Sequence, residues 1–303
     1  MSAYANRSLI IINPKAGSED AVTLMRKLGG AFAARGANFD IIQTEKPGHA
    51  TDLARHAATL GYRTVCVVGG DGTIAEAATG LVGTQTPLAV IPRGTANQVA
   101  LNLAIPIRFE AAVETAVNGR PMPIDLGKVD GRAFALIAGA GFDAAMMSAA
   151  TRDLKERWGF GAYVYGAVKS ALNMSPAKFC VRADDRVLEI SAVSVMIANV
   201  GALFTKYIPV RFPLTPHALG SWTDGVFDIV IVAPKKFPDW ASVLWSAALR
   251  DFSGNERLIH LQARTVTIES DQPIPTQIDG DPVGTTPLTA TVIEKGVQIM
   301  VPA

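Results

Sequence analysis

The chain has 303 residues, of which 28 are basic and 27 acidic, and a formal net charge of +1. Apolar residues make up 49% of the sequence and charged residues 18%, a composition that excludes an intrinsically disordered chain. The near-neutral charge provides no field that would gather nucleic acid, so we expect no nucleic-acid partner.

Simple patterns disfavour several further classes of protein. The longest charge-free runs, residues 77–92 and 190–205, are shorter than the roughly 18 residues that a membrane-spanning helix needs. The N-terminal apolar run breaks at Asn13-Pro14, as a first strand does, and we therefore expect a cytoplasmic protein without a signal peptide. Cys66 and Cys180 form no CxxC pair and the histidines show no HExxH spacing, which argues against a disulfide framework and a zinc hydrolase.

Residues 1–120 alternate short β-type runs with helical patterns. We expect strands at Ser8–Asn13, Phe39–Thr44, Thr64–Val68 and Leu88–Ile91, and helices at Asp20–Arg35, His49–Leu60, Thr73–Leu81 and Thr95–Leu103. This alternation predicts a mostly parallel sheet with helices on both faces, that is, a three-layer α/β domain over residues 1–124. Ligands of such sheets bind at the carboxyl ends of the strands.

From residue 125 the strands are longer and turn signals separate them. We expect strands at Ala133–Ala138, Lys178–Arg182, Leu188–Asn199, Val226–Val232, Thr265–Glu269, Thr289–Ile293 and Val297–Val301, with helices at Thr151–Leu172 and Asp239–Phe252. Asp184-Asp185 has the composition of a hairpin tip. The second part, residues 125–303, is therefore predicted to be an antiparallel β-rich domain.

Three strands of the first domain run into glycine-rich turns: residues 13–17 (NPKAG), 69–73 (GGDGT) and 92–97 (PRGTAN). Glycines let a backbone approach a ligand closely, and a following helix N-terminus offers free N–H groups to an anion. Asp71, an acid between glycines, helps to bind an anion only when a cation mediates, so the turns predict a nucleotide with Mg²⁺. The alternative for each turn is ordinary strand-to-helix turn chemistry.

A second glycine motif, GAGFDA at residues 139–144, matches the loose GxGxxA dinucleotide fingerprint. It lies in the β-rich half, and no acidic residue at the end of a second strand follows about 20 residues later, as that fingerprint requires. A nicotinamide oxidoreductase is therefore the disfavoured alternative.

Taken together, the motifs resemble those of the diacylglycerol kinase catalytic family of lipid kinases, which includes bacterial diacylglycerol kinases, sphingosine kinases and ceramide kinases. Six pieces occur in the family's order: INPKAG (12–17), GGDGT (69–73), PRGTAN (92–97), GAGFDA (139–144), TDGVFDIVIV (223–232) and QIDGD (277–281). The resemblance implies a nucleotide-binding α/β domain followed by an antiparallel β domain, with the active site in the cleft between them. It also implies ATP as phosphoryl donor.

The resemblance assigns one set of residues to the nucleotide: Asn13, Pro14, Lys15, Ala16, Gly17, Thr44, Gly69, Gly70, Asp71, Gly72, Thr73, Glu76, Gly94, Thr95 and Asn97. Asp71 would also hold the catalytic Mg²⁺, with Ca²⁺ as the alternative ion. A structural Mg²⁺ is implied at Asp224, with the backbone carbonyls of Ser221 and Val226.

The resemblance further implies that Asp279 and Asp281 supply the base for the lipid hydroxyl, with Asp71 as the other candidate, and we assign Gly141, Phe142 and Asp143 to the lipid substrate. An alcohol that attacks a γ-phosphate needs a positioned proton acceptor, and a carboxylate suffices because the transition state is loose. The alternative for the DGD sequence at 279–281 is a hairpin turn without a catalytic role.

The sequence departs from the family pattern near the expected site of phosphoryl transfer. Ala75 replaces an Asn, Gln98 replaces an acid, Leu101 stands where the family often has Arg, and Asp281 where it more often has Glu. These changes favour ceramide or a sphingoid base over diacylglycerol as a hypothesis.

The partners expected are ATP and a membrane lipid, reached by peripheral contact with the membrane, and a homodimer is compatible with the sequence. The aromatic helix at 151–172 and the loop at 234–240 are candidates for the membrane contact. Two other functions stay open: a kinase of a soluble metabolite such as NAD, and a nucleotide- or lipid-binding protein without catalysis.

Overall fold

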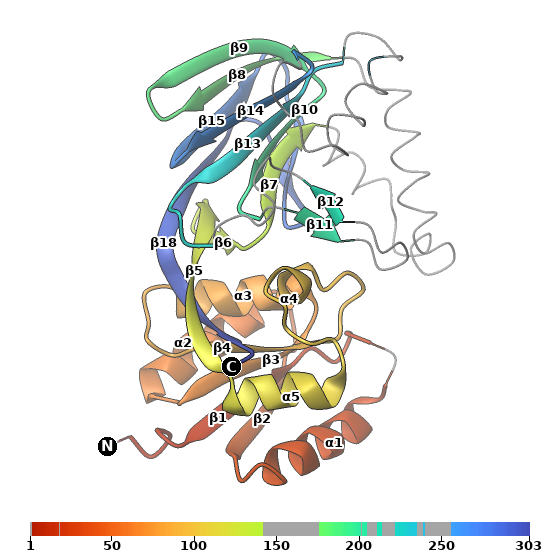
Figure 1. Ribbon diagram of the computed structural model, residues 1–303, viewed down its shortest axis with the longest axis vertical. Helices are drawn as coiled ribbons and strands as arrows, with labels where there is room; N and C mark the ends of the chain where they lie inside the picture. Colours follow the sequence, from red (N-terminus) through yellow and green to blue (C-terminus); the bar gives the residue numbers. More distant parts are fainter. Residues whose placement is uncertain are drawn as a thin grey trace. The chain divides into compact units, whose positions relative to one another are not determined.

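The computed structural model describes residues 2–17, 19–141, 176–200, 202–204, 211–213, 222–234, 239 and 256–303. The chain forms two compact units, shown in Figure 1: the first unit is Met1–Leu126 with Glu294–Ala303, and the second unit is Gly127–Ile293. The helix expected at 151–172, nearly all of the helix expected at 239–252, and most of the loop at 234–240 lie outside the described residues.

The first unit is a parallel α/β domain, as expected. Its elements in chain order are β1 (Arg7–Ile12), α1 (Ala21–Ala33), β2 (Asn38–Gln43), α2 (His49–Leu60), β3 (Thr64–Gly69), α3 (Asp71–Leu81), β4 (Leu88–Pro92), α4 (Gln98–Asn102) and α5 (Phe109–Asn118). The strands lie in the order β2–β1–β3–β4, all parallel. The end of β18 (Leu288–Val301) adds a further parallel neighbour, with Ile299 opposite Leu88.

Helices cover both faces of this sheet (Figure 1). On one face, α1 and α5 pack against alternate residues of β1 and β3, such as Ile10 and Cys66. Helix α1 forms because Asp20 caps its first turn by accepting from the N–H groups of Val22 and Thr23, and because its buried residues Leu24, Leu28 and Phe32 recur every four positions. Helices α2 and α3 contact the sheet from the other side.

The second unit is built almost entirely of antiparallel strands. They are the end of β5 (Arg120–Val129), then β6 (Arg132–Phe134), β7 (Ile137–Gly141), β8 (Ala177–Ala183), β9 (Arg186–Ala192), β10 (Ser194–Ala198), β11 (Ala202–Phe204), β12 (Arg211–Pro213), β13 (Phe227–Val232), β14 (Leu258–Ala263), β15 (Thr265–Ser270), β16 (Pro275–Ile278), β17 (Asp281–Thr285) and the first part of β18.

These strands form two main sheets, in the orders β18–β15–β8–β9 and β14–β13–β10–β7–β16–β17. One hydrophobic core contains residues of both sheets, including Val181 of β8, Val195 of β10 and Ile229 of β13. The rings of Phe134 and Phe227 stack in this core with centroids 5.6 Å apart. A shared core between two antiparallel sheets is the arrangement of a β-sandwich.

The structure differs from the expected elements in several places. The run at 188–199 is two strands, since β9 pairs with β8 whereas β10 pairs with β13 and β7 of the other sheet. The two strands expected at 289–293 and 297–301 are one strand, β18. Because its end pairs with β4, residues 294–303 belong to the first unit and not to the domain expected over 125–303. Helix α5 and strands β5, β11, β12, β14, β16 and β17 were not anticipated, and the single strand expected at 133–138 is two strands, β6 and β7. No helix among the described residues is long and apolar enough to cross a membrane.

Candidate active site

The three glycine-rich turns of the first unit come together at one edge of its sheet, because β1, β3 and β4 are parallel and neighbours. The turns after β1 and β3 are joined by a hydrogen bond from Asn13 Nδ2 to Thr73 Oγ1, at 2.9 Å. Asn13 also organises its own turn, since its Oδ1 accepts from the Lys15 N–H at 3.0 Å. Asn13 and Thr73, which the family resemblance assigns to the nucleotide, are therefore hydrogen-bonded to each other.

The turns after β3 and β4 touch through glycines. A Cβ on Gly94 would lie 2.6 Å from the Gly70 Cα, a distance that no side chain tolerates. The Arg93 N–H donates to the Gly69 carbonyl at 2.8 Å, and Asn97, in a left-handed conformation, accepts from the Gly94 N–H at 2.8 Å. Glycine is required here for close approach of two backbones, and α4 begins only at Gln98, later than expected, because Asn97 leaves the helical region.

Asp71 opens α3 and caps the neighbouring short helix α4. Its two carboxylate oxygens accept from the N–H groups of Gln98 and Val99, each at 3.0 Å. Burial raises the pKa of the Asp71 carboxyl, and the hydrogen bonds from Val99 and Gln98 oppose that effect only in part. The carboxylate therefore links α3 to α4 at the edge of the sheet where the three glycine-rich turns meet.

Two other expected nucleotide residues also have local partners. The Thr44 N–H donates to the Ile12 carbonyl at 2.8 Å, which places Thr44 directly after β2 and beside β1. Glu76 Oε2 accepts from the Ala50 N–H at 3.2 Å and thereby holds the start of α2. Several expected residues of the three turns are exposed: Pro14, Lys15, Gly17, Gly72 and Thr95.

In the second unit, the sequence DGD forms a two-residue hairpin between β16 and β17, with Ile278 opposite Asp281. Asp279 and Gly280 both have positive φ, 48° and 89°. The Asp279 carboxylate accepts three backbone N–H bonds, from Ala135 (3.0 Å), Leu136 (2.9 Å) and Ile137 (3.0 Å). The DGD sequence thus forms a hairpin turn, and Asp279 ties that turn to residues 135–137.

Asp281 has different surroundings. Its side chain is 60% exposed and forms an ion pair with Arg132, Nη2 to Oδ2 2.7 Å. It lies on β17, an edge strand whose residues are all exposed. Of the two hairpin carboxylates, Asp281 is the one more open to solvent.

The remaining expected site residues fall into two groups. Phe142, Asp143 and Ser221 lie outside the described residues. Gly141 ends the antiparallel strand β7, where a Cβ would lie 2.3 Å from the Val193 carbonyl oxygen, so glycine is needed there for packing. The first three residues of the GAGFDA motif, 139–141, thus lie in an antiparallel strand. A dinucleotide fingerprint instead links a strand to a helix.

Of the residues predicted to hold metal ions, the structure describes Asp71, Asp224 and Val226. Asp224 Oδ1 accepts from the Val226 N–H at 3.2 Å, as in an Asx turn, and Gly225 has φ 72°. In the described part of the chain, no three His, Cys, Asp or Glu side chains are grouped to hold a metal ion. Mg²⁺ in phosphoryl-transfer sites is usually held by one or two carboxylates together with phosphate oxygens and water, and Asp71 fits that mode.

The structure also adds residues that the motifs did not single out. Arg93, within PRGTAN, pairs with Glu19 at the start of α1 (Nη1 to Oε2 3.0 Å), and Arg132 pairs with Asp281. Its place as a basic residue in a glycine-containing turn was the signal that the sequence offered for Arg93. For Arg132 the sequence offered none, because its partner lies 149 positions away.

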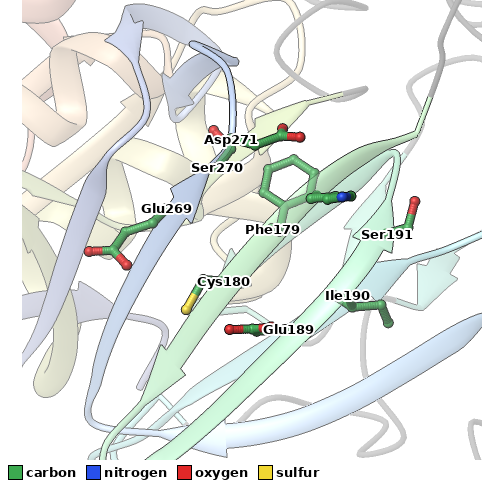
Figure 2. Close-up of a pocket in the computed structure, with 9 residues that line it drawn as sticks. Phe179, Cys180, Glu189, Ile190, Ser191, Glu269, Ser270 and Asp271 are labelled. Atoms are coloured by element: carbon green, nitrogen blue, oxygen red, sulfur yellow. The ribbon is translucent and has the colours of Figure 1, made fainter.

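A groove of about 590 Å³ lies elsewhere, on β8, β9 and β15 (Figure 2). Cys180 stands between Glu189 and Glu269 on neighbouring strands, and Lys178 and Asp271 complete the charged part of the lining. The groove contains none of the expected site residues. Its acidic lining does not suit phosphate groups, so we do not include it in the candidate site.

Comparisons with known proteins match two family models to successive parts of the chain. The model of the diacylglycerol kinase catalytic domain matches residues 7–129, and the model of the YegS C-terminal NAD kinase beta sandwich-like domain matches residues 137–301. The diacylglycerol kinase of Bacillus subtilis is 27% identical over 301 residues, covering 98% of this chain and 96% of that protein.

An uncharacterized protein of Synechocystis, sll0036, is 30% identical over 242 residues, or 77% of this chain, and this chain spans about half of it (54%). A solved structure from Bacillus anthracis, described as that of a diacylglycerol kinase, superposes with a TM-score of 0.80 at 25% identity, covering 98% of this chain and 96% of that one. The expected fold, a parallel α/β domain and an antiparallel β domain, is confirmed. With family models matching both parts of the sequence, the chain belongs to the diacylglycerol kinase family of lipid kinases, with a C-terminal domain of the YegS type.

Proposed function

We propose that this protein is an ATP-dependent lipid kinase, which transfers the γ-phosphate of ATP to the primary hydroxyl of a lipid such as diacylglycerol, ceramide or a sphingoid base. The observation that carries the proposal is the convergence of the three glycine-rich turns at one sheet edge, with Asp71 among them. Family membership supports phosphoryl transfer as the reaction.

The nucleotide is proposed to bind along this edge. Exposed backbone at Gly17 and Gly72 lets phosphate groups approach the chain, and the exposed Lys15 supplies a cation. Thr44, Glu76, Thr95 and the other turn residues named above would surround the nucleotide. Asp71 would hold Mg²⁺, or alternatively Ca²⁺, which when bound supplies positive charge to the phosphate oxygens.

The proton acceptor for the lipid hydroxyl is proposed to be one of the hairpin carboxylates. The three N–H donors on Asp279 fix it in position but compete with a substrate hydroxyl for its oxygens. Asp281 is more accessible, and its pairing with Arg132 would orient its carboxylate. Asp71 is the third candidate. The roles of Asp224 with Ser221 and Val226 in a structural metal site, and of Gly141, Phe142 and Asp143 at the lipid, remain part of this proposal.

The departures from the family pattern support ceramide or a sphingoid base as the preferred lipid. Gln98 is a neutral residue at the position of a family acid, and its backbone N–H binds Asp71. Replacing an acid by this neutral amide removes a negative charge beside the proposed site of phosphoryl transfer. Strong turnover of diacylglycerol with none of ceramide would contradict this preference.

The test is γ-phosphate transfer from ATP with Mg²⁺ to diacylglycerol, ceramide and sphingosine in mixed micelles. Wild type is compared with Asp281→Asn, Asp279→Asn and Asp71→Asn, and the exposed Asp185→Asn serves as a matched control. We expect transfer to one lipid class, reduced at least about a hundredfold when the acceptor is replaced, because proton acceptors contribute about 10²–10⁴-fold. Transfer only to a water-soluble alcohol would indicate a metabolite kinase, and ATP or lipid binding without transfer would indicate a binding protein. Peripheral membrane contact is tested by flotation with vesicles that contain the preferred lipid.

A further inference from the structure

Arg93 occupies a confined position between two of the glycine-rich turns. Its backbone N–H is fixed on the Gly69 carbonyl at 2.8 Å. Its guanidinium lies against Gly17, because a Cβ on that glycine would be 2.8 Å from Nη2 and 3.1 Å from Nε. The side chain is only 15% exposed. A positive charge is therefore held inside the group of turns proposed to bind phosphate.

The hydrogen bonding of this arginine is incomplete. Nη1 donates to Glu19 Oε2 at 3.0 Å. The Nε is buried, and in the described residues it has no hydrogen-bond partner. A buried donor without an acceptor is unfavourable, and a guanidinium presents its N–H groups in a planar fork that matches carboxylate or phosphate oxygens. Glu19 thus occupies Nη1, while Nε has no acceptor within the part of the chain that the structure describes.

We propose that Arg93 is a ligand of the nucleotide phosphates and that Glu19 occupies its guanidinium until the nucleotide binds. The inference rests on the proposed function. A phosphate that accepts from Nε would be bound to the same guanidinium as the Glu19 carboxylate on Nη1, and the two anions repel each other. Binding of the nucleotide would therefore exchange the carboxylate for phosphate oxygens, which also provide the acceptor that Nε lacks. Glu19 in this scheme lowers the affinity for nucleotide, and it holds the Arg93 side chain in place when no nucleotide is bound.

The experiment measures binding rather than turnover, on the full chain. ATP binding is followed by isothermal titration calorimetry, and adenosine binding by ligand-observed NMR, because adenosine lacks phosphate. The variants are Arg93→Gln, Arg93→Lys and Glu19→Gln. Arg26→Gln is the matched control, since Arg26 is an exposed arginine of the same unit. Thermal unfolding of each variant checks that it folds.

For Arg93→Gln we expect ATP affinity to fall roughly ten- to a hundredfold, the range for a hydrogen bond to a charged group, with adenosine affinity unchanged. Glu19→Gln should bind ATP more tightly than wild type, and Arg26→Gln should bind it equally. Arg93→Lys keeps the charge but loses the fork, and should lie between wild type and Arg93→Gln. If Arg93→Gln does not fold, the lysine variant takes its place in the comparison.

Three results would overturn the inference alone. The first is ATP binding by the Arg93 variants equal to that of wild type. The second is a loss of ATP affinity in Glu19→Gln as large as in Arg93→Gln, which would make the ion pair purely structural. The third is equal losses of ATP and adenosine affinity in Arg93→Gln, which would exclude a phosphate contact. If wild type binds no ATP, the proposed function fails together with the inference.

Discussion

Asp71 in the first unit and Asp279 in the second are both acids next to glycine, and both were expected to take part in chemistry. Each proves to accept backbone N–H bonds from a distant part of its own unit. Asp71 accepts two, from the start of α4, and Asp279 accepts three, from residues 135–137. The two carboxylates differ in what those bonds hold together.

Asp71 links two helices that both begin at the sheet edge of the glycine-rich turns, so its structural and proposed chemical roles share one place. Asp279 instead fixes a hairpin, and the exposed carboxylate on that hairpin is Asp281. A motif with an acid beside a glycine therefore predicts where a carboxylate lies. The number of backbone N–H groups that bind this carboxylate decides how much of it stays available to a ligand.

The largest loss of stability is expected from Asp279→Ala. Removing the carboxylate leaves three N–H groups without their acceptor, and we expect the free energy of unfolding of the second unit to fall by about 2–5 kcal/mol. Urea unfolding measures the loss. Asp279→Asn keeps one acceptor oxygen and should lose less; a change within ~0.5 kcal/mol in Asp279→Ala would show that the three bonds do not hold the hairpin.

In the first unit, the equivalent change is Gly94→Ala. The added Cβ would lie 2.6 Å from the Gly70 Cα, so the turns must separate, at a cost of about 1–3 kcal/mol. ATP affinity should fall as well. The matched control is Gly30→Ala on α1, where a Cβ meets nothing within 4 Å and a gain of about 0.4–1 kcal/mol is expected. Equal stabilities of the two variants would contradict the close contact.

A smaller effect concerns the pH dependence of stability. Burial raises the pKa of Asp71 in the folded state above its ordinary value, so the folded protein binds the proton more tightly than the unfolded chain. The contribution of Asp71 to stability therefore decreases as the pH rises from the ordinary carboxyl pKa through the folded pKa. Asp71→Asn removes this dependence, and its stability relative to wild type should increase as the pH rises above the ordinary carboxyl pKa. Parallel urea-unfolding profiles for the two proteins would contradict the prediction.

The smallest effect is expected at the exposed pair beside Asp279. Arg132 and Asp281 are 37% and 60% exposed, and solvent screens such pairs, so Arg132→Gln should cost only about 0.2–1 kcal/mol. A double-mutant cycle with Asp281→Asn measures the coupling. A coupling well above 1 kcal/mol would mean that Asp281 stabilises the fold through this ion pair.

Much of the first unit could be predicted because its signals are local. The helix at 49–60 has the expected bounds, and it ends at Gly61 in a left-handed conformation. The hairpin tip at 184–185 joins β8 and β9 as expected. Helix α5 was missed although its sequence, FEAAVETAVN, has helical composition, and β14 was missed because its alternation is weak.

The sequence by itself determined the parallel strands, the position of the glycine-rich turns at their carboxyl ends and the antiparallel character of the second half, because periodicity and turn residues act over a few positions. Only the tertiary structure decided which groups those turns bring together. Arg93 meets Glu19 across 74 positions, and Asp279 meets Ala135 across 144. A carboxylate accepts from any N–H group that packing places beside it, and no local pattern specifies that partner.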